Sequence, residues 1–181
     1  MKCFVTGASG FIGSNLVREL LARKHRVKAL VRPGSDQHGL AGLDVELAPG
    51  DLSDPALLRR EMGECEWCFH CAASYHLWLP DYKPMYATNV EGTFNVIEAA
   101  GHAGCQRIVH TSTVGCIGLP EEVNGEMVPS TEADIVADKD ITNLTPENLQ
   151  TLCTRCHRFL HATAKRLGMT VPGKLASPVL R

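Results

Sequence analysis

Val5-Thr6-Gly7-Ala8-Ser9-Gly10-Phe11-Ile12-Gly13 is the stretch of sequence that decides the fold. A short apolar run, residues 3–5, leads into it, and an amphipathic segment follows it. This order predicts a strand, a glycine turn and a helix. The first N–H groups of a helix lack intrahelical partners, and the helix dipole favours negative charge there. The stretch therefore predicts a turn that places the pyrophosphate of a dinucleotide on a helix N-terminus.

Each glycine of this stretch has its own expected role. Gly7 would make the turn, Gly10 would let a cofactor approach the backbone, and Gly13 would let helix and strand pack closely. Three further residues complete the predicted cofactor-binding loop: Thr6, Phe11 and Ile12.

Strands and helices are expected to alternate through the first two thirds of the chain. Strands are predicted at residues 3–5, 27–31, 45–47, 67–71 and 107–111, and helices at residues 12–23, 55–62 and 85–103. Asp54 and Pro55 start the second helix, because aspartate is a favoured N-cap and proline is tolerated at the first helical position. The pattern predicts an α/β fold with right-handed crossovers, a Rossmann-type doubly wound parallel sheet in the order 3-2-1-4-5.

The character of the sequence changes near Val123. Residues 1–122 are predicted to form an NAD(P)-binding Rossmann domain. Residues 123–145 are acidic and lack a clear period, which predicts a loop or linker. Residues 146–181 are predicted to form a short, mostly helical tail. The Rossmann fold is therefore expected to be truncated.

Composition argues against several classes of protein. With 181 residues the chain is long enough for one domain with a core, and its formal net charge of -2 gives no basic surface for a nucleic-acid partner. No apolar run approaches the roughly 20 residues that span a bilayer, and the N-terminus reads as a strand rather than a signal segment. We therefore expect a cytoplasmic location and no membrane partner, with the eight cysteines as thiols or metal ligands. The oligomeric state stays open.

Two charged residues follow predicted strands and are candidates for contacts with the adenosine half of a dinucleotide. Arg32 closes the second strand, where the adenosine ribose would lie. An arginine there suits a 2′-phosphate, which favours NADP over NAD, although an ordinary solvated arginine is the alternative. Asp51 follows the third strand and could meet the adenine edge. It could equally be a simple turn former, and both interpretations are open.

Five short motifs occur in order along the chain: residues 6–13, Gly50-Asp51-Leu52, His70-Cys71-Ala72-Ala73, Asn89-Val90-Glu91-Gly92-Thr93 and His110-Thr111-Ser112-Thr113. Over residues 1–134 the chain thereby resembles the extended short-chain dehydrogenase/reductase group, the NAD(P)-dependent epimerase/dehydratases. Within that group it is closest to the branch of reductases and hopanoid-associated sugar epimerases. The resemblance implies a dinucleotide cofactor and a small-molecule substrate that is sugar-like or a ketone.

The same resemblance implies roles for matching residues. Asp51 and Leu52 would lie at the cofactor, and Ala72 and Ala73 would lie beside one of its riboses, where small side chains let the backbone approach. Asn89 would support the active site from the long helix. Thr113 would hydrogen-bond a substrate carbonyl or alcohol, and it is the candidate catalytic residue.

The chain departs from this family at the acid/base. Family members use Tyr-x-x-x-Lys, in which the tyrosine transfers the proton and the lysine lowers its pKa. The three tyrosines lie at positions 75, 82 and 86, and none of them forms this motif. The sequence therefore predicts impaired catalysis. A truncated or chimeric gene product without activity is a further interpretation.

The tail carries a second signature, Cys153-Thr154-Arg155-Cys156-His157, with His161 following. It resembles an incomplete zinc-binding end of an HNH endonuclease, although the segment at residues 132–136 lacks that motif's histidine. Two thiolates in C-x-x-C spacing can bind one tetrahedral zinc, and His157 or His161 could complete the site with Cys153 and Cys156. A zinc-dependent nucleic-acid-binding or nuclease tail is thus the alternative function. A second C-x-x-C, at residues 65–68, is interpreted instead as buried apolar packing in the sheet.

Overall fold

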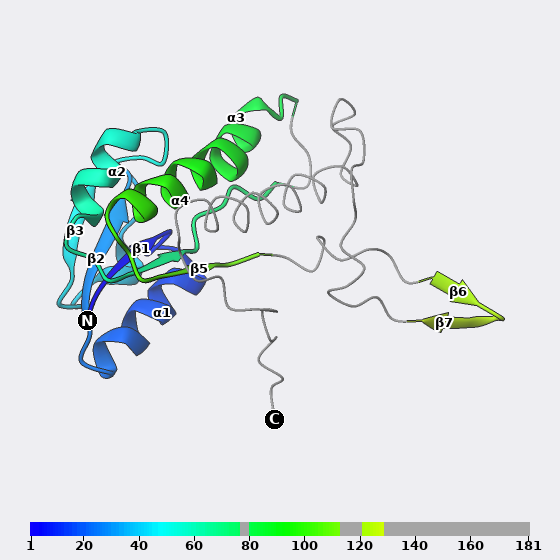
Figure 1. The fold of residues 1–181 in the computed structure, drawn as a ribbon, viewed down its shortest axis with the longest axis horizontal. Coiled ribbons are helices and arrows are strands. Elements are labelled where there is room, and N and C mark those ends of the chain that lie inside the picture. Colours follow the sequence, from blue (N-terminus) through cyan, green and yellow to red (C-terminus); the bar gives the residue numbers. More distant parts are fainter. Residues whose placement is uncertain (77–79, 113–120, 129–181) are drawn as a thin grey trace.

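The computed structural model of the protein describes residues 1–76, 80–112 and 121–128. Its centre is a five-stranded, all-parallel sheet in the order β3-β2-β1-β4-β5, which confirms the predicted fold class and strand order (Figure 1). The strands are β1 (Lys2–Thr6), β2 (Arg26–Val31), β3 (Glu46–Pro49), β4 (Trp67–His70) and β5 (Arg107–His110). The third strand starts one residue later than expected and continues to Pro49.

Helices cover both faces of the sheet (Figure 1). They are α1 (Phe11–Ala22) on one face and α2 (Pro55–Met62) and α4 (Gly92–His102) on the other. Alternate residues of β1 divide between the two faces, as a strand's period of two requires. Val5 is in one buried cluster with Val17 of α1. Phe4 is in the other, with Leu58 of α2 and Val96 of α4.

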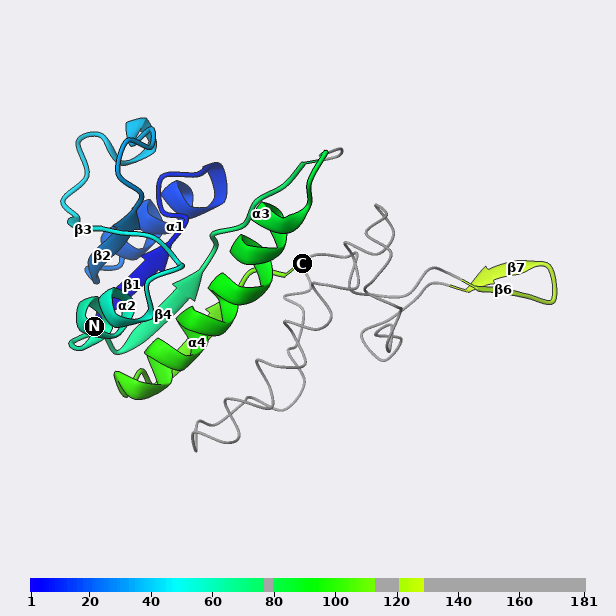
Figure 2. The same ribbon diagram turned by 90° about the horizontal axis from the view of Figure 1, so that it is seen from above.

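A long helical rod precedes β5 and replaces the single helix expected at residues 85–103 (Figure 2). It comprises α3 (Lys83–Tyr86), a π-helical segment η2 (Ala87–Glu91) and α4. Such π-helical turns often mark functional sites. Where η2 meets α4, a Cβ on Gly92 would lie 2.9 Å from Cβ of Leu52, so glycine lets the rod approach the segment that follows β3.

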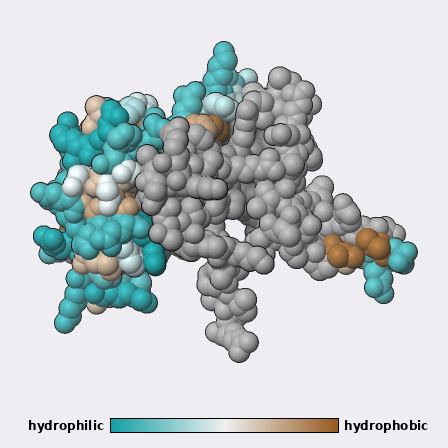
Figure 3. All heavy atoms as spheres, viewed as in Figure 1, coloured by the Kyte–Doolittle hydropathy of each residue, from teal (hydrophilic) through white to brown (hydrophobic). Residues whose placement is uncertain are grey.

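A β-hairpin lies where the sequence predicts a loop. It consists of β6 (Glu121–Val123) and β7 (Glu126–Val128), paired antiparallel. Asn124 and Gly125 at its tip have φ of 54° and 82°, the positive values that a type I′ turn needs. The loop prediction is therefore wrong for residues 123–128, because the Asn-Gly dipeptide favours a hairpin despite the acidic composition. The exposed apolar side chains of the hairpin, Val123, Met127 and Val128, form the brown patch at the right of Figure 3.

Several predictions fall on residues outside the described part of the chain. They concern Thr113, the predicted helical tail, and the zinc candidates Cys153, Cys156, His157 and His161. The boundaries proposed for the three segments stay predictions. Within the described residues, no helix is both long enough and apolar enough to cross a bilayer.

Candidate functional site

The carboxyl ends of four neighbouring strands carry most of the predicted site residues. Gly7 follows β1, Arg32 follows β2, Asp51 lies just beyond β3, and Ala72 lies just beyond β4. Because all these strands run in parallel, their carboxyl ends share one edge of the sheet. In open α/β sheets, ligands bind outside this edge.

The glycine turn is closed by backbone atoms in direct contact. Gly7 has φ of +65°, and a Cβ there would lie 2.6 Å from the backbone nitrogen of Ala72. The Gly10 N–H donates to the Gly7 carbonyl at 3.1 Å. A Cβ on Gly13 would overlap that same Gly7 carbonyl oxygen. The turn at Gly7 and the close helix–strand approach at Gly13 are thus both present, whereas the role of Gly10 toward a cofactor stays a prediction.

The N-terminus of α1 is open toward a ligand. Gly10 is its N-cap residue, and among the described residues no side chain caps this helix. The first-turn side chains of Phe11 and Ile12 are 87% and 58% exposed. By contrast, α2 is capped by Asp54, whose carboxylate accepts from the N–H groups of residues 56 and 57, as predicted. The open end of α1 therefore offers unsatisfied N–H groups and positive dipole charge to an anion.

The segment that follows β4 is held by side chains from two other elements. The Ala72 N–H donates to the Thr6 hydroxyl at 3.2 Å. Asn89, in η2, clasps Ser74: its Oδ1 accepts from the Ser74 N–H at 2.7 Å, and its Nδ2 donates to the Ser74 carbonyl at 2.8 Å. These bonds fix Ala72, Ala73 and Ser74 beside the glycine turn.

A buried histidine lies beneath this site. His70, the last residue of β4, is 1% exposed. Its Nδ1 lies 2.6 Å from the Thr6 hydroxyl and its Nε2 lies 2.9 Å from the Thr93 hydroxyl. Burial, with a smaller effect from His110 stacked at a 5.1 Å centroid distance, lowers the pKa of His70 to about 3. The sequence places His70 within the motif at residues 70–73 but does not indicate its role.

The residues expected near the adenosine half of a cofactor differ in their exposure and in their contacts. Arg32 is exposed, forms no ion pair with another described residue, and starts a turn in which the Ser35 hydroxyl donates to its carbonyl at 2.7 Å. The Asp51 carboxylate accepts from the Ser53 N–H at 2.9 Å, a contact that favours the turn-former interpretation. Leu52 is buried in the core, so only its backbone can face a ligand.

Cys65 and Cys68 lie in the hydrophobic core between β4 and the helices above it, which confirms their interpretation as apolar packing. Burial raises the pKa of the Cys65 thiol to about 11, so this residue stays a thiol at neutral pH. Within residues 1–76, 80–112 and 121–128, no three histidine, cysteine or acidic side chains gather as a metal site.

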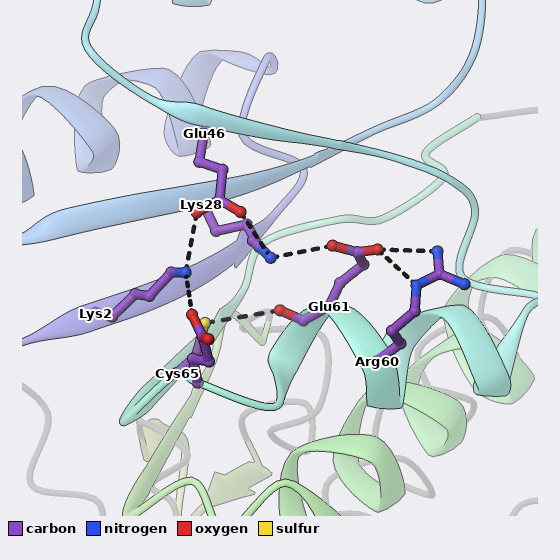
Figure 4. A network of polar contacts seen from close by, with 7 residues as sticks. Lys2, Lys28, Glu46, Arg60, Glu61 and Cys65 are labelled. Carbon is purple, nitrogen blue, oxygen red and sulfur yellow. Dashed lines mark hydrogen bonds and ion pairs between the residues drawn. The ribbon is translucent and has the colours of Figure 1, made fainter.

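The amino end of the sheet carries a charged network, defined as Lys2, Lys28, Glu46, Glu61 and Glu64. The first four of these residues are labelled in Figure 4. Lys2 Nζ lies 2.9 Å from a carboxylate oxygen of Glu46 and 2.9 Å from one of Glu64. Lys28 Nζ lies 2.8 Å from Glu46 and 3.0 Å from Glu61. Hydrogen bonds from Lys28 and Lys2 lower the pKa of Glu46. This network links β1, β2, β3 and α2 at the end of the sheet away from the glycine turn.

The parallel sheet, the uncapped glycine turn and the segment after β4 together define a Rossmann-type α/β domain with its ligand site at the carboxyl edge. The chain belongs to the NAD dependent epimerase/dehydratase family, whose sequence model matches residues 3–139.

Individual relatives agree with this membership. Sterol demethylase protein B of Methylococcus capsulatus is 41% identical over 127 residues, covering 70% of this chain and 39% of the relative. Cinnamoyl-CoA reductase 1 of Oryza sativa is 34% identical, covering 98% of this chain and 54% of the relative. UDP-glucose 4-epimerase of Thermus thermophilus, solved in complex with NAD, aligns with a TM-score of 0.74 at 25% identity, covering 93% of this chain and 52% of that one. The chain thus spans between about a third and about half of the length of the relatives it matches.

Proposed function

We propose that this chain is the NAD(P)-binding part of a reductase- or epimerase-like protein. The observation that carries the proposal is the open N-terminus of α1, where Gly10 replaces a capping side chain and Gly7 and Gly13 close the turn beneath it. A pyrophosphate placed there would accept hydrogen bonds from the first-turn N–H groups. The exposed Phe11 and Ile12 side chains would flank it. The NAD complex of the Thermus epimerase supports the same cofactor class.

Arg32 favours NADP over NAD as the bound dinucleotide. It follows β2 at the edge where the adenosine ribose lies in a doubly wound fold, and its guanidinium is not engaged by a described acid. A guanidinium binds a phosphate through short, charge-assisted hydrogen bonds. Asp51, Leu52, Ala72 and Ala73 would contribute mainly backbone contacts to the cofactor.

The substrate is proposed to be sugar-like or a ketone, following the reductase and epimerase names of the relatives. Thr113 is the proposed hydrogen-bond donor to its oxygen. None of the three tyrosines forms Tyr-x-x-x-Lys, so we infer that this chain binds its cofactor but turns over substrate poorly by itself.

Equilibrium titration with NADPH and NADH tests the proposal. We expect saturable binding of both, with NADPH tighter. Arg32→Ala should weaken NADPH binding by roughly 1–3 kcal/mol, about 5- to 150-fold, and leave NADH binding nearly unchanged. The matched control is Arg59→Ala, which removes an exposed arginine of α2. Absence of saturable binding at millimolar cofactor would exclude the proposed function, and equal losses for both cofactors would exclude the 2′-phosphate contact.

A further inference from the structure

We infer that His70 is a positioning residue, a neutral imidazole protonated at Nε2 that fixes the segment after β4 against the glycine turn. The inference rests on the proposed function, because these two backbone segments are the ones proposed to hold the dinucleotide. His70 itself is buried and would not touch the cofactor.

The direction of each hydrogen bond in this network can be worked out from the backbone carbonyl of Asn89. The Thr93 hydroxyl lies 2.7 Å from the Asn89 carbonyl, which can only accept, so Thr93 donates its single hydrogen there. Thr93 must then accept from His70, which places the ring hydrogen on Nε2. A neutral ring with Nε2–H leaves Nδ1 as an acceptor, and Thr6 donates to it. Thr6 in turn accepts from the Ala72 N–H.

This series of hydrogen bonds connects the helical rod to the proposed cofactor site. Thr6 directly precedes Gly7, and the backbones of Gly7 and Ala72 are already in contact. The orientation of the Thr6 hydroxyl therefore influences how Ala72 sits on the turn. At the other end of the chain of contacts stands Asn89, whose side chain holds Ser74. Both ends of the network thus act on the same segment after β4.

Loss of the Thr93 acceptor leaves a buried donor without a partner, whichever nitrogen of the ring carries the hydrogen. If the hydrogen stays on Nε2, the Nε2–H group has no acceptor. If the hydrogen moves to Nδ1, Thr6 accepts from both His70 and Ala72, and the Thr6 hydrogen loses its partner in the ring. A buried polar group left unsatisfied in this way destabilises its arrangement. A change in α4 is therefore expected to loosen the contact between Ala72 and the glycine turn.

The experiment compares two threonine-to-valine variants of the full chain. Thr93→Val removes the acceptor for His70. Thr88→Val is the matched control. The Thr88 hydroxyl likewise donates to the backbone carbonyl four residues earlier, that of Pro84, at 3.0 Å, but Thr88 does not contact His70. We expect Thr93→Val to weaken NADPH binding by about tenfold, and Thr88→Val to leave it unchanged. Thr93→Ser, which restores the hydroxyl, should restore affinity.

Nitrogen NMR of the imidazole supplies a readout that does not depend on cofactor. In the free wild-type chain, the His70 spectrum should show Nε2 protonated and Nδ1 unprotonated, and in Thr93→Val the signal of a hydrogen-bonded Nε2–H group should be lost. A wild-type ring protonated at Nδ1 would overturn the inference, even if Thr93→Val does not fold. Unchanged affinity in a folded Thr93→Val variant would overturn it as well. Failure of the wild-type chain to bind either cofactor would instead exclude the proposed function, a result separate from the tautomer.

Discussion

The two ends of the central sheet are built from opposite chemistry. The amino end holds the charged network, in which Lys2 and Lys28 each bind two carboxylates (Figure 4). At the carboxyl end, the groups around the glycine turn are uncharged: hydroxyls of Thr6 and Thr93, a neutral His70, and backbone atoms in contact around Gly7. Carboxylates near the open N-terminus of α1 would compete with, or repel, the anion proposed to bind there.

From this division we expect that ligand binding depends on the carboxyl end, whereas both ends contribute to stability. Salt bridges at the amino end tie strands to α2 without approaching the ligand edge. At the carboxyl end, close backbone packing and neutral hydrogen bonds give rigidity and leave the helix dipole for the ligand. Substitutions at the amino end should therefore change stability without changing cofactor affinity.

The largest expected effect is at the carboxyl end, where Gly13→Ala would force a Cβ into the Gly7 carbonyl oxygen. Such overpacking against backbone should lower the free energy of unfolding by about 3 kcal/mol or more and abolish cofactor binding. Urea denaturation and NADPH titration measure both. Gly63→Ala is the control, because its Cβ would lie 3.4 Å from the nearest backbone oxygen, that of Arg60, in ordinary contact. A Gly13→Ala variant with wild-type stability would contradict the tight approach of helix and strand.

Acid should destabilise the two ends over different ranges of pH. Burial lowers the pKa of His70 from an ordinary 6.5 to about 3, with His110 as the second cause, so the unfolded chain binds a proton that the folded chain excludes. This contribution to stability is complete above pH 6.5 and is lost as pH falls toward 3. The pKa of Glu46 is also lowered in the folded chain, so its contribution to stability is lost only as pH falls below the ordinary value of 4.5. Between pH 6.5 and pH 4.5, protonation of His70 in the unfolded chain lowers the free energy of unfolding by roughly 2–3 kcal/mol.

Urea midpoints measured from pH 7 to pH 4 test this separation. His70→Gln should flatten the dependence between pH 6.5 and pH 4.5. An unchanged slope in His70→Gln would show that the buried imidazole does not govern acid sensitivity at this end.

Sequence reasoning is most successful where a single local segment determines the geometry. The glycine turn and the Asp54 cap follow from short-range patterns, and the strand order follows from the crossover rule for alternating strands and helices. The structure agrees with all three. The His70 network could not be predicted in the same way, since His70 meets partners 64 and 23 residues away. Only the folded sheet brings them together.

Two other differences have distinct causes. The π-helical segment η2 carries Asn89, whose side chain holds Ser74, and no helical period in the sequence reveals this contact. The hairpin at residues 121–128 was predictable, because Asn124-Gly125 is a strong turn signal, but the acidic composition around it obscured the short strands. Composition is a weaker guide than a specific turn dipeptide.

A smaller effect is expected at the amino end from Lys28→Met. Lys28 is largely buried, and its loss leaves Glu46 and Glu61 without their shared cation, although both carboxylates retain some contact with water. We expect a loss of about 1–2 kcal/mol in stability and no change in NADPH affinity. Arg23→Met is the control, because its ion pair with Glu19 is exposed on both sides and should contribute little. A change in affinity in Lys28→Met would break the proposed division between the two ends.

The smallest effect sharpens the comparison within the carboxyl end, where two helices begin in different ways. Asp54 caps α2 with its own carboxylate, whereas α1 starts at Gly10 without a side-chain cap among the described residues. Asp54→Ala should therefore cost about 1 kcal/mol of stability, and Asp54→Asn, which can still accept from the same N–H groups, should cost little. Cofactor affinity should not change in either variant, because the N–H groups of α2 are already committed to Asp54. A change in NADPH binding in Asp54→Ala would mean that the ligand reaches the N-terminus of α2. The anion could then no longer be assigned to the N-terminus of α1 alone among the helices of the described residues.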